Sequence, residues 1–171
     1  MDDRFIVIGE NTHATRVLMR KSPRIVGGEG QEAIAFPGED GTTLHLPVPD
    51  AVRRGQDFEE GRVKHIRIAI LAGMGSDPAA ARLGRAYITH VVRAQEAAGA
   101  HFLDLNVDEM SIRLDRQQAA MDWLVRCVQE ISRLPLSVDS SNLEIIATGL
   151  AACAPGGPRP MVNSASLERL E

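Results

Sequence analysis

The sequence predicts an α/β fold, and two observations carry this prediction. Between residues 76 and 163, three segments with helical apolar spacing alternate with three short apolar runs of the kind that form strands. A further β-branched run, FIVIG, stands at residues 5–9 and is closed by a glycine. Strands that alternate with helices of this length are typical of βαβ units, which place the strands parallel in one sheet.

Two architectures satisfy this order of elements, a doubly wound sheet and a (β/α)8 barrel. No G-x-G-x-x-G sequence follows the run at 5–9. That glycine pattern normally binds the phosphates of a dinucleotide. Its absence disfavours the dinucleotide-binding form of the doubly wound sheet, and it leaves both architectures open.

Composition places the chain among ordinary globular proteins. It has 171 residues, 44% hydrophobic and 25% charged, with a net charge of −4. This balance gives no basic surface for nucleic acid, and no segment is long and apolar enough to span a membrane. The N-terminus lacks the layout of a signal peptide. We therefore expect a cytoplasmic protein in which Cys127 and Cys153 are reduced thiols.

The first part of the chain is interrupted after its strand at 5–9. Residues 21–61 are rich in Gly and Pro, and we interpret them as an insertion in the main fold. Within it, apolar runs at 33–36 and 43–48 flank a turn at Asp40-Gly41, which predicts a β-hairpin. The segment RVKHIRIAILAGM, residues 62–74, predicts a short helix.

The second part of the chain has sharper signals. Ser76 or Asp77 followed by Pro78 predicts a helix start, and Gly99 predicts its end. Apolar residues at helical spacing predict a second helix over 120–134, stopped by Pro135. The remaining predicted elements are strands at 101–107, 136–139 and 160–163 and a helix at 142–154.

Acids and amides stand at the C-terminal end of every predicted strand of this sheet. They are Glu10 and Asn11, Asp104 and Asn106, Asp139, and Asn163. In parallel α/β folds this edge of the sheet is where ligands bind. A set rich in Asp and Asn and poor in Lys, Arg and His suits a neutral ligand with several N–H donors better than a phosphate.

A simpler interpretation exists for each of these residues taken singly. An Asp, Ser or Asn after a strand often caps the following helix, as Ser140, Ser141 or Asn142 can do here, with help from Asp139. The repetition of the pattern on four strands favours a ligand site. His13 lies three residues past Glu10, in a predicted loop, and the five histidines do not lie at ligand spacing, so no metal site is predicted.

Five segments resemble, in order, the first half of the pterin-binding domain family. They are IGEN, GAHFLDLNVDE, AAMDWLVRCVQEI, LPLSVDSSNLEIIATGLAAC and MVNSASLE. This family includes methyltetrahydrofolate:corrinoid methyltransferases, the folate domain of cobalamin-dependent methionine synthase, and dihydropteroate synthase. The resemblance covers residues 5–12 and roughly 85–171, and it leaves the 21–61 insertion without a counterpart.

The resemblance favours the methyltransferase branch of the family. Dihydropteroate synthases carry T-P-D-S-F and G-G-E-S-T-R-P loops where this chain has GENTH and LNVDE. The methyltransferases have a Gly-Glu-Arg-x-Asn pattern after the first strand, of which Gly9 and Glu10 are kept. The resemblance therefore implies transfer of the N5-methyl group of methyltetrahydrofolate to a cobalamin or other corrinoid held by a partner protein or domain, as part of one-carbon metabolism.

The same resemblance implies a (β/α)8 TIM-barrel fold and roles for particular residues. In this family the pterin lies in a polar cup at the C-terminal face of the barrel. By resemblance, Asp139 and Asn163 match residues that hydrogen-bond the pterin, Asn106 lines the cup, and Glu10 supports it. The family's catalytic contacts near N5 come from later strands and have no position here. Dihydropteroate synthase and a non-catalytic pterin-binding module remain alternatives.

A complete (β/α)8 barrel takes at least about 200 residues, and this sequence supplies about four βα units. We therefore expect residues 1–171 to be the N-terminal half of a pterin-binding barrel domain. Either the chain continues in a longer gene product, or another chain completes the barrel, for example in a homodimer.

Overall fold

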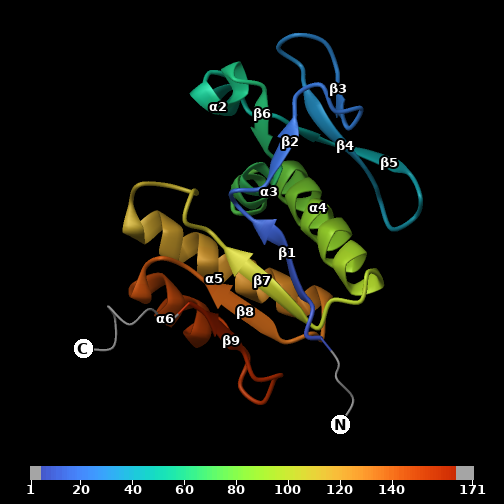
Figure 1. Ribbon diagram of the computed structural model, residues 1–171. Coiled ribbons are helices and arrows are strands. Elements are labelled where there is room, and N and C mark those ends of the chain that lie inside the picture. Colours follow the sequence, from blue (N-terminus) through green and yellow to red (C-terminus); the bar gives the residue numbers. More distant parts are fainter. Residues whose placement is uncertain (1–4, 165–171) are drawn as a thin grey trace.

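A central parallel sheet organises the computed structural model, which describes residues 5–164 (Figure 1). Its strands are β1 (Ile8–His13), β7 (Phe102–Asn106), β8 (Leu136–Asp139) and β9 (Met161–Asn163), in the order β1-β7-β8-β9. Every neighbouring pair is parallel, which confirms the predicted α/β fold. Within the described residues the sheet stays open, so closure into a barrel is not seen.

Three helices connect these strands, and Figure 1 shows α5 and α6 behind the sheet and α4 beside β1. They are α4 (Pro78–Ala97), α5 (Leu114–Ile131) and α6 (Leu143–Ala152). Asp77 caps α4 by accepting a hydrogen bond from the amide of Ala79, and Gly99 follows its end with a φ of 85°. No helix in the described part of the chain is long and apolar enough to cross a membrane.

Helix α5 begins six residues earlier than the apolar spacing predicts, at Leu114 rather than residue 120. Its first turns carry Asp115 and Arg116, so the apolar period is weak there although the backbone is already helical. The predicted apolar face of this helix is confirmed further along, where Leu124 and Val128 are fully buried. Cys127 is buried on the same face, and burial raises the pKa of its thiol to about 11. This thiol therefore stays protonated at neutral pH.

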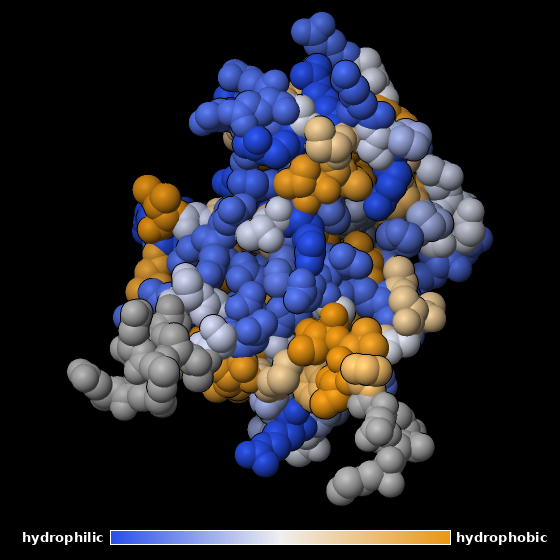
Figure 2. All heavy atoms as spheres, in the orientation of Figure 1, coloured by the Kyte–Doolittle hydropathy of each residue, from blue (hydrophilic) through white to orange (hydrophobic). Residues whose placement is uncertain are grey.

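The first strand differs from its prediction, because β1 runs from Ile8 to His13 rather than over residues 5–9. Its position is set by pairing with β7, with an irregularity in register between Gly9 and Thr12. Phe5 and Ile6 precede the paired segment and are 89% and 69% exposed. A local apolar run therefore marked the strand but not the register, which depends on the partner. Hydrophobic side chains gather at this lower end of the sheet in Figure 2.

The segment between β1 and α4 forms a small unit of its own. Strands β2 (Val17–Met19) and β6 (Arg62–Lys64) pair antiparallel and bring its two ends together. Between them lie β3 (Ile25–Val26), β4 (Ala33–Pro37), β5 (Thr43–Pro47), α1 (Asp50–Arg53) and α2 (Gln56–Glu59). The predicted hairpin is confirmed as β4 and β5, with Gly41 at a φ of 79° in the turn.

This unit packs directly on the main fold. Phe36 of β4 meets the ring of Tyr87 on α4 edge to face, with centroids 4.9 Å apart, and both residues are buried. The segment predicted as a helix over 62–74 divides into β6 and α3 (His65–Gly73). Helix α3 lies against α4 and carries the buried residues Ile66, Ile68 and Ile70. The unit and the sheet thus share one hydrophobic core.

Gly84 allows helices α3 and α4 to approach closely, and its replacement by Ala is expected to destabilise the protein. A Cβ at this position would lie 2.4 Å from the carbonyl oxygen of Ala69 and 2.6 Å from the amide nitrogen of Gly73. Because both contacts are backbone atoms, the helices must separate, at a cost of about 1–3 kcal/mol. Urea unfolding measures this loss. The control is Gly28→Ala, where a Cβ meets nothing within 4 Å, and a shift of less than about 0.5 kcal/mol is expected.

Candidate functional site

Four polar side chains lie in one row across the C-terminal edge of the parallel sheet. The strand register pairs His13 with Asn106, Asn106 with Asp139, and Asp139 with Asn163. Three of these residues, Asn106, Asp139 and Asn163, were predicted as site residues from the sequence, and the structure makes them neighbours. Figure 2 shows hydrophilic side chains gathered over these strand ends.

Asn106 is held in one orientation by two hydrogen bonds. Its Oδ1 accepts a bond of 3.0 Å from the backbone amide of Asp108, and its Nδ2 therefore points to Asp139, donating to Oδ2 over 2.9 Å. The side chain is only 7% exposed. Asn106 thus fixes the carboxylate of Asp139 in place.

Asp139 keeps an oxygen available for a ligand. Its Oδ2 accepts the bond from Asn106, and Oδ1 makes no hydrogen bond with any residue between 5 and 164. Burial raises the pKa of Asp139, and the nearby Asp104 and Asp108 raise it further, against the opposing effects of Asn106 and His13. A carboxylate with this uncompensated charge is suited to bind N–H donors.

Asp139 does not act as a helix cap. Asn142 caps α6, with its Oδ1 accepting a 2.8 Å bond from the amide of Glu144. The two serines between them bond to Asp108, through the Ser140 hydroxyl and the Ser141 amide. Asp108 therefore connects the loop after β7 to the loop after β8. Asp139 takes part neither in this connection nor in the cap of α6.

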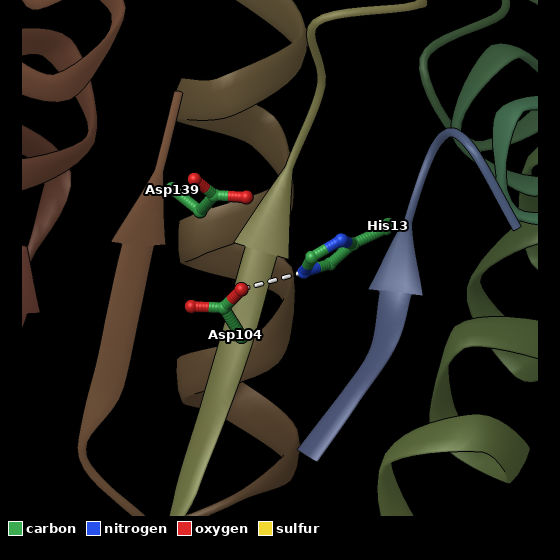
Figure 3. A group of neighbouring side chains, drawn as sticks. All are labelled: His13, Asp104 and Asp139. Atoms are coloured by element: carbon green, nitrogen blue, oxygen red, sulfur yellow. Dashed lines mark hydrogen bonds and ion pairs between the residues drawn. The ribbon is translucent and has the colours of Figure 1, made fainter. Parts of the chain in front are cut away.

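His13, at one end of this row, pairs with the buried Asp104 of β7 (Figure 3). His13 Nε2 lies 2.6 Å from Asp104 Oδ2, and the two side chains are 12% and 0% exposed. In the described chain, the second oxygen of Asp104 has no hydrogen-bond partner, and neither has the buried hydroxyl of Ser137 on the adjacent strand. Asp104 and Ser137 thus carry buried oxygen atoms whose hydrogen-bonding capacity is unused by the described residues.

A comparison with protein-family models matches residues 81–171, more than half of the chain, to the pterin binding enzyme family. The chain belongs to the pterin binding enzyme family. Asn106, Asp139 and Asn163 all lie inside the matched segment. The pterin-binding match begins within α4, so His13, Glu10 and the unit between β1 and α4 lie outside it.

Glu10 stands apart from the row in this pterin-binding enzyme. Glu10 was predicted to lie just past the first strand, but it lies inside β1 and is exposed. Its Oε2 accepts a 2.8 Å hydrogen bond from Arg16 Nη2, and its backbone oxygen accepts another from Arg16 Nε. The structure therefore does not bring Glu10 to Asp139, because β1 continues past Glu10 and ends at His13, which pairs with Asn106. Its supporting role in the pterin site stays a prediction.

His13 is the site residue that sequence reasoning missed, since it was assigned to a loop. One ligand atom each from His13, Asp104 and Asp139 lie within 4.8 Å of one another, as Figure 3 shows for their side chains. Imidazole and carboxylate groups so arranged could hold a divalent cation. The spacing of histidines along the chain could not indicate this group. A strand ending at His13 would have been the signal, because it places the imidazole at the same sheet edge as the carboxylates.

Proposed function

We propose that this pterin-binding enzyme is a methyltransferase that transfers the N5-methyl group of methyltetrahydrofolate to a corrinoid carrier. One observation carries the pterin part of the proposal, the carboxylate of Asp139 at the C-terminal sheet edge, oriented by Asn106 and with one oxygen unused. The ordered motifs shared with the methyltransferase branch, and the lack of the dihydropteroate synthase loops, support the methyl-transfer part.

The pterin ring offers a row of N–H donors along its pyrimidine edge. An ionised Asp139 can accept two parallel bonds from such an edge, and the half-buried Asn163 on the next strand can both donate and accept. Asn106 acts mainly through Asp139, since one hydrogen of its amide and its oxygen are engaged within the protein. Asn106 is therefore a positioning residue in this proposal.

Methyl transfer requires the N5 atom of the pterin to leave as an amine. A neutral tertiary amine is a poor leaving group, so protonation or hydrogen bonding at N5 has to develop toward the transition state. The corrinoid, held by a partner protein or domain, would supply the nucleophilic cobalt(I) that takes the methyl group. The part of this chain is to hold the pterin against the strand ends and leave its outer face open to the partner, as the open hydrophilic surface in Figure 2 allows.

The fold of the family supports a place for these strands in a larger domain. In the proposal, β1, β7, β8 and β9 are the first four strands of a (β/α)8 barrel, and residues 21–61 are an insertion after the first of them. The parallel order β1-β7-β8-β9 and the interleaved helices are consistent with this assignment.

Calorimetric titration of the protein with two ligands tests the proposal. Methyltetrahydrofolate is expected to bind, and methyl transfer to cob(I)alamin is expected when the complete barrel is present. Binding of 6-hydroxymethylpterin pyrophosphate with turnover of p-aminobenzoate would instead identify a dihydropteroate synthase. Tight binding of methyltetrahydrofolate without transfer to any corrinoid acceptor would identify a pterin-binding module and contradict the methyltransferase assignment.

A further inference from the structure

A second polar cavity lies outside the strand-end row, between the start of the inserted unit and helices α3 and α4. It has a volume of about 370 Å³. Its polar lining consists of Asn11, Arg16, Arg24, His65 and His90. Among the described residues, no Asp or Glu lines it.

Arg24 is held rigidly at this cavity. Its carbonyl oxygen accepts a 2.7 Å bond from the amide of Ala35 in β4, which anchors its backbone to the small sheet. Its guanidinium lies 5.7 Å from the ring centroid of Tyr87, and Nη2 donates a 2.7 Å bond to the Tyr87 hydroxyl. Arg24 makes no ion pair with any residue that the structure describes. Most of its five N–H donors therefore remain free.

The hydrogen bonds behind Arg24 continue to a histidine. The Tyr87 hydroxyl also lies 3.0 Å from His65 Nδ1. Because a guanidinium only donates, the hydroxyl accepts from Arg24, and it can then give its own hydrogen to Nδ1. In this arrangement Nδ1 is an acceptor and His65 Nε2 carries the hydrogen. Arg24, Tyr87 and His65 thus form a hydrogen-bonded chain in which the Tyr87 hydroxyl and His65 Nδ1 are both satisfied. The remaining N–H groups of Arg24 are donors.

The charged groups that line the cavity are both positive. Burial, and next the charges of Arg24 and Arg16, lower the pKa of His65 to about 4. Burial and Arg24 also lower the pKa of His90. Both imidazoles are neutral at pH 7, so the two guanidinium groups carry the charge. Arg16 is paired with the half-exposed Glu10, whereas Arg24 has no carboxylate partner among the described residues.

We propose that this cavity is a binding site for a small oxyanion group, a carboxylate or a phosphate, with Arg24 as its principal ligand. Two oxygens of such a group match the planar fork of a guanidinium. Neutral His65 and His90 and the amide of Asn11 add hydrogen-bonding groups around the same volume. Arg24 belongs to the small unit between β1 and α4, and none of the four residues in the row of strand ends lines this cavity. The proposed site is therefore separate from that row.

Titration of the protein with inorganic phosphate, and separately with glutarate, tests the site by calorimetry. The variant is Arg24→Gln, which keeps a polar side chain but removes the charge and the fork, and a loss of affinity of at least about tenfold is expected. Arg20→Gln is the matched control, because the Arg20 guanidinium stacks 4.7 Å over the ring of Phe58 and does not line the cavity. Melting curves by circular dichroism establish that both variants fold.

A second variant distinguishes binding from packing. Tyr87→Phe keeps the ring that meets Phe36 but removes the hydroxyl that holds Arg24, so weaker binding is expected with an unchanged overall fold. Equal affinity of wild type and Arg24→Gln for both anions would overturn the proposal. An equal loss in Arg20→Gln would also overturn it, since it would show general attraction to positive charge.

The source of the oxyanion is tested with two pterins, and this arm alone rests on the proposed pterin function. If the group is the glutamate tail of a folate, Arg24→Gln weakens the binding of tetrahydrofolate but not that of tail-less 6-methyltetrahydropterin. If it is a free anion, Arg24→Gln changes neither pterin titration and still weakens phosphate or glutarate binding. Failure of both pterins to bind wild type would contradict the pterin function and leave the phosphate result as the test of the cavity.

Discussion

Asp139→Asn is expected to weaken pterin binding by roughly 10- to 150-fold while the fold stays intact. A hydrogen bond to a charged group contributes about 1.5–3 kcal/mol, and the substitution removes the charge. An asparagine oriented by Asn106 would also turn its NH₂ group toward the N–H donors of the pterin, because its oxygen is used by Asn106. Calorimetric titration with methyltetrahydrofolate measures the loss.

The same variant should be at least as stable as the wild type at pH 7. Burial raises the folded-state pKa of Asp139 above its ordinary value of 3.8, so the folded state binds this proton more tightly than the unfolded state. Folding stability therefore falls as the pH rises from 3.8 through the raised pKa, and ionised Asp139 lowers the free energy of unfolding above that window. Asparagine has no such dependence, so urea unfolding at pH 4 and pH 7 should show the variant gaining relative to wild type at the higher pH.

Asp122→Asn is the matched control for both measurements. Asp122 lies on α5, is partly exposed, and pairs with Arg126 one turn further along. It is expected to leave pterin affinity unchanged and to alter stability by less than about 0.5 kcal/mol. If Asp139→Asn lowered stability and left pterin affinity alone, Asp139 would be a structural residue and the proposed site would be wrong.

His13→Ala is expected to destabilise the protein by about 1–3 kcal/mol. The carboxylate of Asp104 is 0% exposed, and the His13 ring is its one hydrogen-bond partner among the described residues. Removing the hydrogen-bond partner of a buried polar group leaves that group desolvated and unsatisfied, and a loss of that size is typical. Urea unfolding at pH 7, with the midpoint and slope compared to wild type, measures the change.

A double-mutant cycle separates the loss of the pair from the loss of packing. In the Asp104→Asn background the carboxylate that His13 contacts is absent, so His13→Ala should cost clearly less than in the wild type. Equal costs in the two backgrounds would contradict the coupling of His13 and Asp104. A His13→Gln variant retains a donor and is expected to fall between wild type and His13→Ala.

Local signals predicted many parts of this molecule correctly, because each depends on residues close together in the chain. The turn at Asp40-Gly41 and the caps at Asp77 and Asn142 were visible in short segments. The end of α5 was predicted three residues too late, because the apolar spacing continues to Leu134 although the helix ends at Ile131. The strand β1 was located only roughly, because an apolar run marks a strand but its register comes from pairing with β7.

The error in β1 carried over to the site. Placing the strand at 5–9 put Glu10 at its end and His13 in a loop, whereas the observed strand end is at His13 and Glu10 pairs outward with Arg16. Asn106 and Asp139 were located correctly, because β7 and β8 are short strands between clear helices and have no such irregularity.

The alternation of strands and helices between residues 76 and 163, and the polar row of Asn106, Asp139 and Asn163, could be predicted from the sequence. The row could be predicted because side chains alternate along a strand, and parallel strands bring their C-terminal ends to one edge. The tertiary structure alone decided the pairing of His13 with Asp104 and the place of Arg24 beside Tyr87. These contacts join residues far apart in the chain, and they follow from strand register and from the packing of the inserted unit on α4, which no local periodicity encodes.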